Sequence, residues 1–255
     1  MARRKKVEFD QGSIKLPGTL GVDNPTGRHN ADLGQSVARL VKGNTYKDLS
    51  TIALIPTRGT IHAKVVQAWW NMMAPMNQKF LRFFISGHEV GVAYSQTIEG
   101  ILQNPDLREW KYILTMEDDC IPPQDGLLKL YESMDKYDVV QGLYWTKGEG
   151  GQPMIYGDPK VMPKNFTPQV PVIDDVQECN GLGMGFNLFK LSLFRDGRIE
   201  KPWFRTVQEV VPGQGARAFT QDLWFFNNAA KWGYRFACDT RIKVGHYDAN
   251  TDIVW

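Results

Sequence analysis

Cysteine is scarce in this chain, and no long apolar run is present. The 255 residues include three widely spaced cysteines, Cys120, Cys179 and Cys238, with no CxxC pair. This odd, scattered set argues against a disulfide framework and a thiolate zinc site, and is typical of a reducing compartment. No apolar stretch approaches the roughly 18 to 20 residues of a membrane span, and the N-terminus lacks the apolar core of a signal peptide. We therefore expect a soluble, cytoplasmic protein.

An excess of one charge is also lacking. Lysine and arginine number 30 against 28 aspartate and glutamate residues, and this balance argues against a protein built mainly to coat polyanions. The apolar share of 42% and the charged share of 23% are close to those of soluble globular proteins, which argues against disorder and fibrous repeats. The local exception is a basic tail at residues 3–6 (RRKK), which is either a solvated terminus or a contact to phosphates or anionic lipid.

Short apolar runs alternate with helix-like stretches from residue 51 onward. The pattern predicts strands at 51–55, 81–85, 111–116 and 137–143, with helices at 62–73, 92–103 and 124–134 between them. This alternation indicates βαβ units, and therefore a mixed, mainly parallel sheet flanked by helices in a single α/β domain.

The two ends of the chain are less regular. Residues 1–48 are rich in turns and hold one helical candidate at 32–41, so we expect an N-terminal arm or cap on a domain of residues 49–255. Later come a Gly/Pro-rich stretch at 148–171, an apolar segment at 184–194 and an expected mobile loop at 206–218. A helix at 222–232 and a last strand that reaches His246 complete the predicted elements.

Three consecutive acids, Glu117, Asp118 and Asp119, follow the third predicted strand. In open α/β sheets ligands bind beyond the carboxyl ends of the strands, where this triplet lies. Neighbouring carboxylates repel one another, so such a cluster costs stability unless a cation neutralises it. Hard oxygen ligands suit Mg²⁺ or Mn²⁺. The alternative is a solvated acidic cluster at the start of the next helix.

Two later residues extend the metal hypothesis. Asp222 lies at the start of an aromatic-rich helix, and His246 follows the apolar run 242–245. A lone histidine is usually structural. In a chain with an acidic metal candidate, His246 is also a candidate nitrogen ligand or phosphate contact.

Six segments together resemble, in order and spacing, the landmarks of GT-A glycosyltransferases similar to family 2. They span residues 51 to 248, about four-fifths of the chain. The segments are 55–58 (IPTR), 112–122 (YILTMEDDCIP), 183–190 (GMGFNLFK), 220–225 (TQDLWF), 232–236 (WGYRF) and 244–246 (VGH).

The resemblance implies a GT-A-type, Rossmann-like fold that binds a nucleotide-diphosphate sugar, with UDP-sugars favoured, together with Mn²⁺ or Mg²⁺. The triplet matches the family's DxD motif, so Asp119 is implied as a metal ligand, and Glu117 or Asp118 would face the ribose. His246 matches a histidine that binds the metal in some GT-A enzymes. The loop after the first strand would contact the nucleotide through Pro56, Thr57 and Arg58.

The same resemblance assigns the acceptor side of the reaction. Asp222 matches the acid of the ED motif, which in inverting members is the general base that deprotonates the acceptor hydroxyl. Gln221 stands where the family has Glu, and Glu117 stands where it has the first Asp of DxD. Arg217, just before this helix, either closes over the diphosphate or is a solvated loop arginine. The acceptor would be a saccharide or glycoconjugate, or a hydroxymethylated base in DNA.

Three other functions use some of the same residue types. A nucleotidyltransferase shares this sheet and acid placement but releases pyrophosphate, and a metal-dependent nuclease or phosphoesterase also uses carboxylates and a histidine. The third is a nicotinamide-dependent enzyme, since residues 181–185 (GLGMG) resemble a dinucleotide fingerprint, but Phe186 stands where the last glycine belongs. We expect these glycines to lie beside the acceptor pocket, where they admit close backbone approach.

Overall fold

The computed structural model describes residues 47–255 apart from 77 and 212–214, without the side chains of 209–218. The chain divides into two units, Met1–Asp48 and Leu49–Trp255, and the second is described here. The helix expected at 32–41 lies outside the described residues, so the N-terminal arm stays a prediction.

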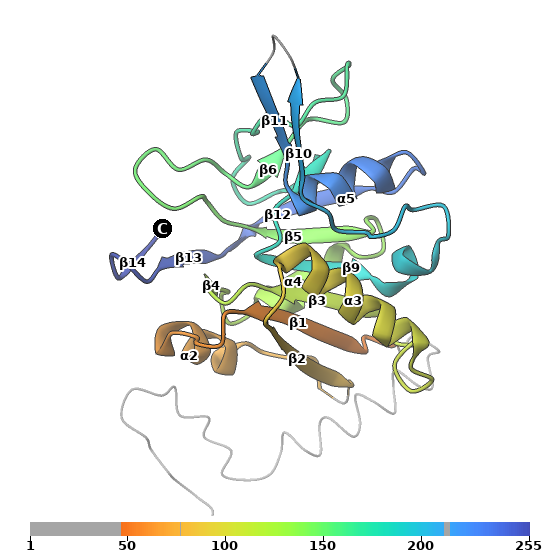
Figure 1. The fold of residues 1–255 in the computed structure, drawn as a ribbon. Helices are drawn as coiled ribbons and strands as arrows, with labels where there is room; N and C mark the ends of the chain where they lie inside the picture. Colours follow the sequence, from red (N-terminus) through yellow and green to blue (C-terminus); the bar gives the residue numbers. More distant parts are fainter. Residues whose placement is uncertain (1–46, 77, 212–214) are drawn as a thin grey trace, which may run out of the picture. The chain divides into compact units, whose positions relative to one another are not determined.

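A seven-stranded mixed sheet forms the centre of the second unit (Figure 1), in the order β2-β1-β3-β9-β5-β12-β7. Strands β1, β2, β3, β5 and β12 run in one direction, whereas β9 and β7 are antiparallel to their neighbours. The mainly parallel sheet predicted from the sequence is thus confirmed. The bounds are β1 Thr51–Thr57, β2 Phe80–Ser86, β3 Tyr112–Met116, β5 Val139–Leu143, β7 Val176–Cys179, β9 Phe186–Lys190 and β12 Phe236–Lys243.

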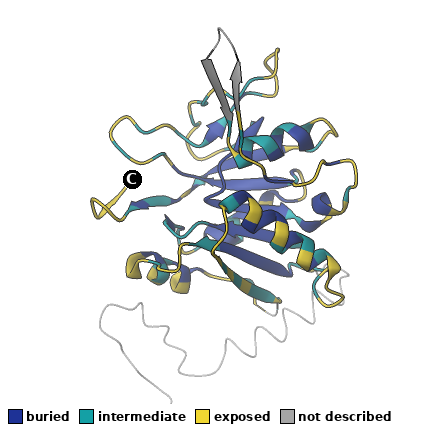
Figure 2. Ribbon diagram, viewed as in Figure 1, coloured by how far each residue is buried: buried dark blue, intermediate teal, exposed yellow. Residues whose placement is uncertain are grey.

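Among the described residues, four helices cover the two faces of this sheet, and each contributes apolar residues at helical spacing to one of two cores. Helices α3 (Val90–Gln103) and α5 (Gln221–Ala230) contribute to one core, for example through Ile98 and Phe225. Helices α2 (Ala63–Asn71) and α4 (Gly126–Ser133) contribute to the other through residues such as Trp69 and Leu130. Figure 2 shows the buried sheet between helices whose outer sides are exposed. None of the described helices is both long and apolar enough to cross a bilayer.

Shorter elements lie outside the central sheet. The Gly/Pro-rich stretch contains β6 (Ile155–Tyr156), which pairs with β8 (Gly181–Leu182), and a 3₁₀ helix, η1 (Leu191–Arg195), follows β9. A separate three-stranded sheet joins β4 (Cys120–Ile121), β13 (Gly245–Asp248) and β14 (Ile253–Val254). This small sheet lies next to the acidic triplet, because β4 directly follows it.

Three sequence predictions need correction. The first strand was expected to end before Pro56, but it continues through this residue. Beyond Leu54, β1 pairs only with β2. Proline has no N–H, and on the side that faces β3 no hydrogen bond is lost. The expected loop at 206–218 is a hairpin of β10 (Val207–Val211) and β11 (Gly215–Phe219). His246 lies within β13 rather than at the end of the preceding strand.

Candidate functional site

The acidic triplet forms a tight turn at the carboxyl end of β3. The N–H of Cys120 donates to the carbonyl of Glu117 at 3.0 Å, and the N–H of Glu117 donates to Gly185 at 3.1 Å. The neighbouring strand β1 ends at the same edge of the sheet, because β1 and β3 are parallel and in direct register. Residues from the two strand ends therefore meet, as the sequence pattern predicts.

These two strand ends line one cavity of about 670 Å³. The two strand ends are joined directly, because the backbone N–H of Arg58 donates to Oδ2 of Asp118 at 3.3 Å. Gly87, His88, Glu89 and Val90, from the β2–α3 connection, complete the lining and were not singled out in the sequence. Six residues predicted for the donor and metal site lie together in this cavity: Pro56, Thr57, Arg58, Glu117, Asp118 and Asp119.

Pairing between β4 and β13 brings His246 to the triplet. His246 pairs with Cys120 in this small sheet, and the N–H of Tyr247 donates to the carbonyl of Asp119 at 2.7 Å. The imidazole Nε2 consequently lies 3.4 Å from Oδ2 of Asp119. Nδ1 lies 2.7 Å from the carbonyl oxygen of Trp145. Because a carbonyl oxygen can only accept, Nδ1 carries a hydrogen atom and Nε2 is the nitrogen presented to Asp119.

Lys147 is a further partner of Asp119 that sequence reasoning missed. Its ammonium lies 2.5 Å from Oδ2 of Asp119. Burial by itself would raise the pKa of Asp119, but the ammonium of Lys147 and the imidazole of His246 in its protonated form, which then donates from both nitrogens, lower it to about 2 through hydrogen bonds and charge. Asp119 is therefore an ionised carboxylate that attracts cations. No motif marks Lys147, which comes from the connection after β5 and meets Asp119 only through the fold.

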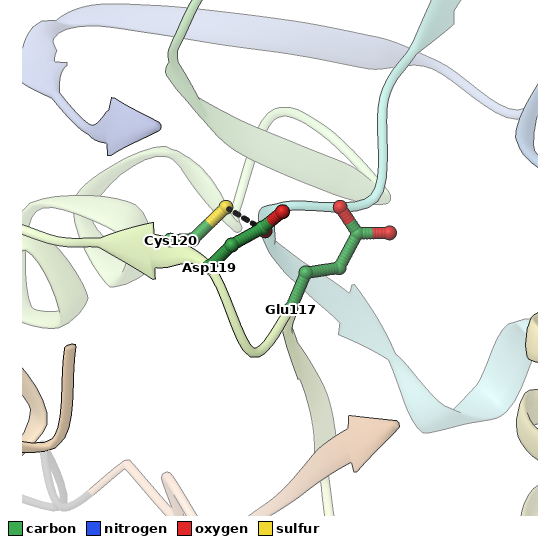
Figure 3. Close-up of side chains that lie close together, drawn as sticks. All are labelled: Glu117, Asp119 and Cys120. Atoms are coloured by element: carbon green, nitrogen blue, oxygen red, sulfur yellow. Dashed lines mark hydrogen bonds between the residues drawn. The ribbon is translucent and has the colours of Figure 1, made fainter. Parts of the chain in front are cut away.

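Glu117 has the opposite electrostatic character. Burial and the charges of Asp119, Asp222 and Asp118 raise its pKa to about 8. Its carboxylate has no hydrogen-bond partner among the described residues. Figure 3 shows this carboxylate next to that of Asp119, with the thiol of Cys120 beyond. Potential ligand atoms of these three residues all lie within 4.8 Å of one another. Burial raises the pKa of the Cys120 thiol well above its usual range, so the carboxylates are the better cation ligands.

Asp222 lies in the first turn of α5, two residues after the N-cap Thr220. Its side chain is buried, with Oδ1 accepting from the N–H of Leu223 at 2.9 Å. Burial raises its pKa, which makes the carboxylate a stronger base. Asp222 does not line the 670 Å³ cavity, but its charge acts on Glu117. Arg217 is on β11, and its side chain lies outside the described residues.

The glycines at 183 and 185 fit close against Tyr144, behind the triplet. A Cβ at Gly183 would overlap the Tyr144 hydroxyl, and one at Gly185 would crowd the same ring. The N–H of Gly185 donates to the Tyr144 oxygen at 3.0 Å. The Tyr144 ring meets the imidazole of His246 edge-on at 5.4 Å. The glycine pattern thus admits a buried tyrosine that supports His246.

Comparison with known proteins gives a likeness of fold. No family model matches the chain, and no curated protein matches it. The chain is similar to the crystal structure of A197 from STIV, with a TM-score of 0.56 and 17% identity over 80% of this chain and 92% of that one. With the sheet order described above, this likeness supports the GT-A-type fold predicted from the sequence.

Looser likenesses involve two proteins whose names refer to nucleotide sugars. S. aureus TarS 1–349 in complex with UDP-GlcNAc has a TM-score of 0.42 and 10% identity over 76% of this chain and 58% of that chain. A nucleoside-diphosphate-sugar pyrophosphorylase from Vibrio cholerae RC9 has a TM-score of 0.36 and 10% identity over 76% and 93%. At such scores neither protein's activity carries over to this chain.

Proposed function

We propose that this protein is a metal-dependent glycosyltransferase that moves a sugar from a nucleotide-diphosphate sugar to an acceptor hydroxyl. The observation that carries the proposal is the 3.4 Å approach of His246 to Asp119, a lining residue of the cavity between two strand ends. UDP-sugars are the preferred donors, because the six sequence landmarks resemble those of GT-A enzymes of the family 2 type.

The residues around Asp119 fit a divalent cation. Asp119 supplies an ionised oxygen, and His246 presents Nε2 because its Nδ1 donates to a carbonyl. A histidine whose second nitrogen is fixed by a backbone carbonyl is the usual arrangement of a metal ligand. Mn²⁺ or Mg²⁺ held there by Asp119 and His246 would stabilise the negative charge of the departing diphosphate.

The chain's own groups account for donor binding. Pro56, Thr57 and Arg58 line the same cavity as the triplet, where they would contact the nucleotide. Glu117 or Asp118 would accept hydrogen bonds from the ribose hydroxyls. Lys147 pairs with Asp119, the residue that would also hold the metal. When the donor binds, its ammonium would turn from Asp119 to the diphosphate oxygens. Arg217 is a further candidate for the diphosphate.

Asp222 is the proposed general base. It would take the proton of the acceptor hydroxyl while that oxygen bonds to the anomeric carbon and the bond from this carbon to the diphosphate breaks. The raised pKa of this buried carboxylate favours proton acceptance. A saccharide or glycoconjugate is the first acceptor class, and a hydroxymethylated base in DNA is the second.

The decisive experiment is a panel of nucleotide sugars incubated with the full chain and Mn²⁺, with and without chelator. Release of free nucleoside diphosphate that stops in chelator is the expected result. An acceptor screen with saccharides and hydroxymethylated DNA would then identify the product. Pyrophosphate release from a nucleoside triphosphate and a sugar phosphate would instead indicate nucleotidyl transfer. Cleavage of nucleic acid without donor turnover would indicate a nuclease.

A further inference from the structure

A second cavity, of about 410 Å³, lies between the C-terminal end of α5, the start of β12 and the loop before β7. It shares no lining residue with the cavity at the acidic triplet. Helix α5 has ten residues, so it is roughly 15 Å long. Asp222 lies at its first turn, whereas Lys231 is its C-cap and lines the second cavity. Because they share no lining residue, the two cavities are separate sites.

The floor and wall of this cavity are held by buried groups. Cys179 and Phe236, which pair directly across β7 and β12, are only 3% and 2% exposed. The loop wall is fixed to the sheet, because the amide of Asn180 donates to the carbonyl of Asn165 at 2.9 Å. At Gly157, a Cβ would overlap that same carbonyl oxygen. The cavity is thus preorganised rather than formed by a loose loop.

Three cationic side chains line this cavity, and only one of them has an acidic partner among the described residues. Arg235 pairs with Glu178. Lys164 and Lys231 have no carboxylate within ion-pair distance in the described part of the chain. Lys231 donates to Oδ1 of Asn228 at 2.8 Å. Lys164 is 3.5 Å from Oδ1 of Asn227, and its ammonium lies over the ring of Phe166 at 5.2 Å.

Two unneutralised ammonium groups beside one cavity repel each other. Burial lowers the pKa of Lys164, and the charge of Lys231 lowers it further. Each ammonium has three hydrogens and directs one of them to an asparagine oxygen, so donors remain for a ligand. A lysine at a helix C-terminus is an ordinary complement to the helix dipole, which explains Lys231 alone. It does not explain why Lys164, from a different loop, is held beside it.

We propose that this cavity binds a small ligand that carries a phosphate group on an apolar or aromatic body. The phosphate would lie between the ammonium groups of Lys164 and Lys231, where a doubly charged oxyanion relieves their repulsion. The apolar body would pack on Met162 and Tyr234, and Met162 is 80% exposed. This site is independent of the proposed sugar transfer.

The test is a titration of the full chain with phenyl phosphate in the presence of chelator. Binding is monitored by two-dimensional ¹H–¹⁵N NMR spectra. Chelator keeps the probe from binding through a metal at Asp119. Saturable shifts at the amides of Asn180 and Lys231 are expected, and benzyl alcohol, which lacks the phosphate, should not reproduce them. The variant Lys164→Gln/Lys231→Gln should bind about tenfold more weakly or worse, since two charge-assisted contacts are lost.

A matched control changes two exposed lysines that do not line the cavity. Lys160→Gln/Lys243→Gln makes the same change in net charge, and Lys160 lies on the same loop as Lys164. The control should bind phenyl phosphate like the unmodified chain. Equal weakening in both double variants, or shifts confined to residues around Asp119, would overturn the proposal. So would the absence of saturable shifts in the unmodified protein, since its spectrum also reports that the fold is intact.

Discussion

Asp119 lies between an imidazole and an ammonium, and this position decides what binds there. His246 Nε2 is 3.4 Å and Lys147 Nζ is 2.5 Å from the same carboxylate oxygen. The carboxylate of Asp119 therefore pairs with a cation even without a metal, namely the ammonium of Lys147. A metal must compete with Lys147 for the carboxylate oxygen of Asp119. It must also compete with a proton for the lone pair of His246 Nε2.

The first prediction concerns Asp119→Asn. Removing the charge should abolish Mn²⁺ binding and Mn²⁺-dependent turnover, because the amide no longer neutralises the cation. Mn²⁺ binding is measured by electron paramagnetic resonance, and turnover by release of nucleoside diphosphate. Asp138→Asn is the matched control, since Asp138 also pairs with a lysine, Lys190, at 2.9 Å but lies outside the cavity. Normal Mn²⁺ binding by Asp119→Asn would show that Asp119 is not a metal ligand.

The second prediction concerns Lys147→Gln. Without the competing ammonium, Mn²⁺ should bind about fivefold more tightly, which corresponds to the roughly 1 kcal/mol of a partly exposed ion pair. Binding of the nucleoside diphosphate should weaken, because its oxygens lose a cationic partner. Calorimetric titrations with Mn²⁺ and then with nucleoside diphosphate separate these two effects. If both affinities stay unchanged, Lys147 is only a surface partner of Asp119.

The third prediction concerns Glu117 and pH. Its pKa is raised from 4.5 to about 8 in the folded protein, so between these values the folded state holds a proton that the unfolded chain has lost. The stabilising effect is present below pH 4.5 and is lost as the pH rises through about 8. Glu117→Gln should flatten this fall, whose slope is at most about 1.4 kcal/mol per pH unit. Urea unfolding in chelator at several pH values measures it, and parallel profiles for both proteins would refute it.

At the scale of elements, Gly183 and Gly100 offer a matched comparison. Gly183→Ala should lower the unfolding free energy by about 1–3 kcal/mol, because its Cβ would overlap the hydroxyl oxygen of the buried Tyr144. Gly100 lies within α3, and an added Cβ there would have nothing within 4 Å, so Gly100→Ala should raise the unfolding free energy by about 0.5–1 kcal/mol. Thermal unfolding measures both changes. Equal effects at the two positions would mean that Tyr144 yields readily.

The predicted elements came from local patterns, and the unpredicted ones depend on distant partners. Up to β5, the helices and all strands except the two-residue β4 follow apolar periodicity that a short window contains. Strand β9 instead lies between β3 and β5, and its antiparallel place depends on pairing with both. The β10–β11 hairpin was mistaken for a loop because its glycine-rich sequence also suits an irregular segment.

At the scale of the whole molecule, the sequence could predict those parts of the candidate site that follow neighbouring strands of the sheet. The loop after β1 and the triplet after β3 meet because parallel neighbours end at the same edge. His246 was singled out by type and resemblance, although its place on β13 was not predicted. Lys147, Tyr144 and the second cavity were missed, since each depends on loops brought together only by the folded chain.

The last prediction concerns how α5 completes the site. Asp222 is buried in the first turn of α5, outside the cavity lining but near enough for its charge to act on Glu117. As a general base it would matter only for transfer, whereas the proposed donor site is made by groups at the ends of β1 and β3 and by His246 on β13. Asp222→Asn should therefore keep nucleoside-diphosphate binding and lose transfer by about 100-fold or more.

The alternative is a purely structural role, in which Asp222 stabilises the start of α5 through the helix dipole. Its loss would then lower the stability of the fold but not the rate of transfer. Asp125→Asn at the start of α4 makes the same change at another helix and provides the control. Melting temperature, nucleoside-diphosphate affinity and single-turnover transfer rate are measured for both variants. A selective loss of transfer in Asp222→Asn identifies the base. Near-normal transfer at saturating acceptor would exclude it, and would favour a retaining mechanism, which needs no such base opposite the donor.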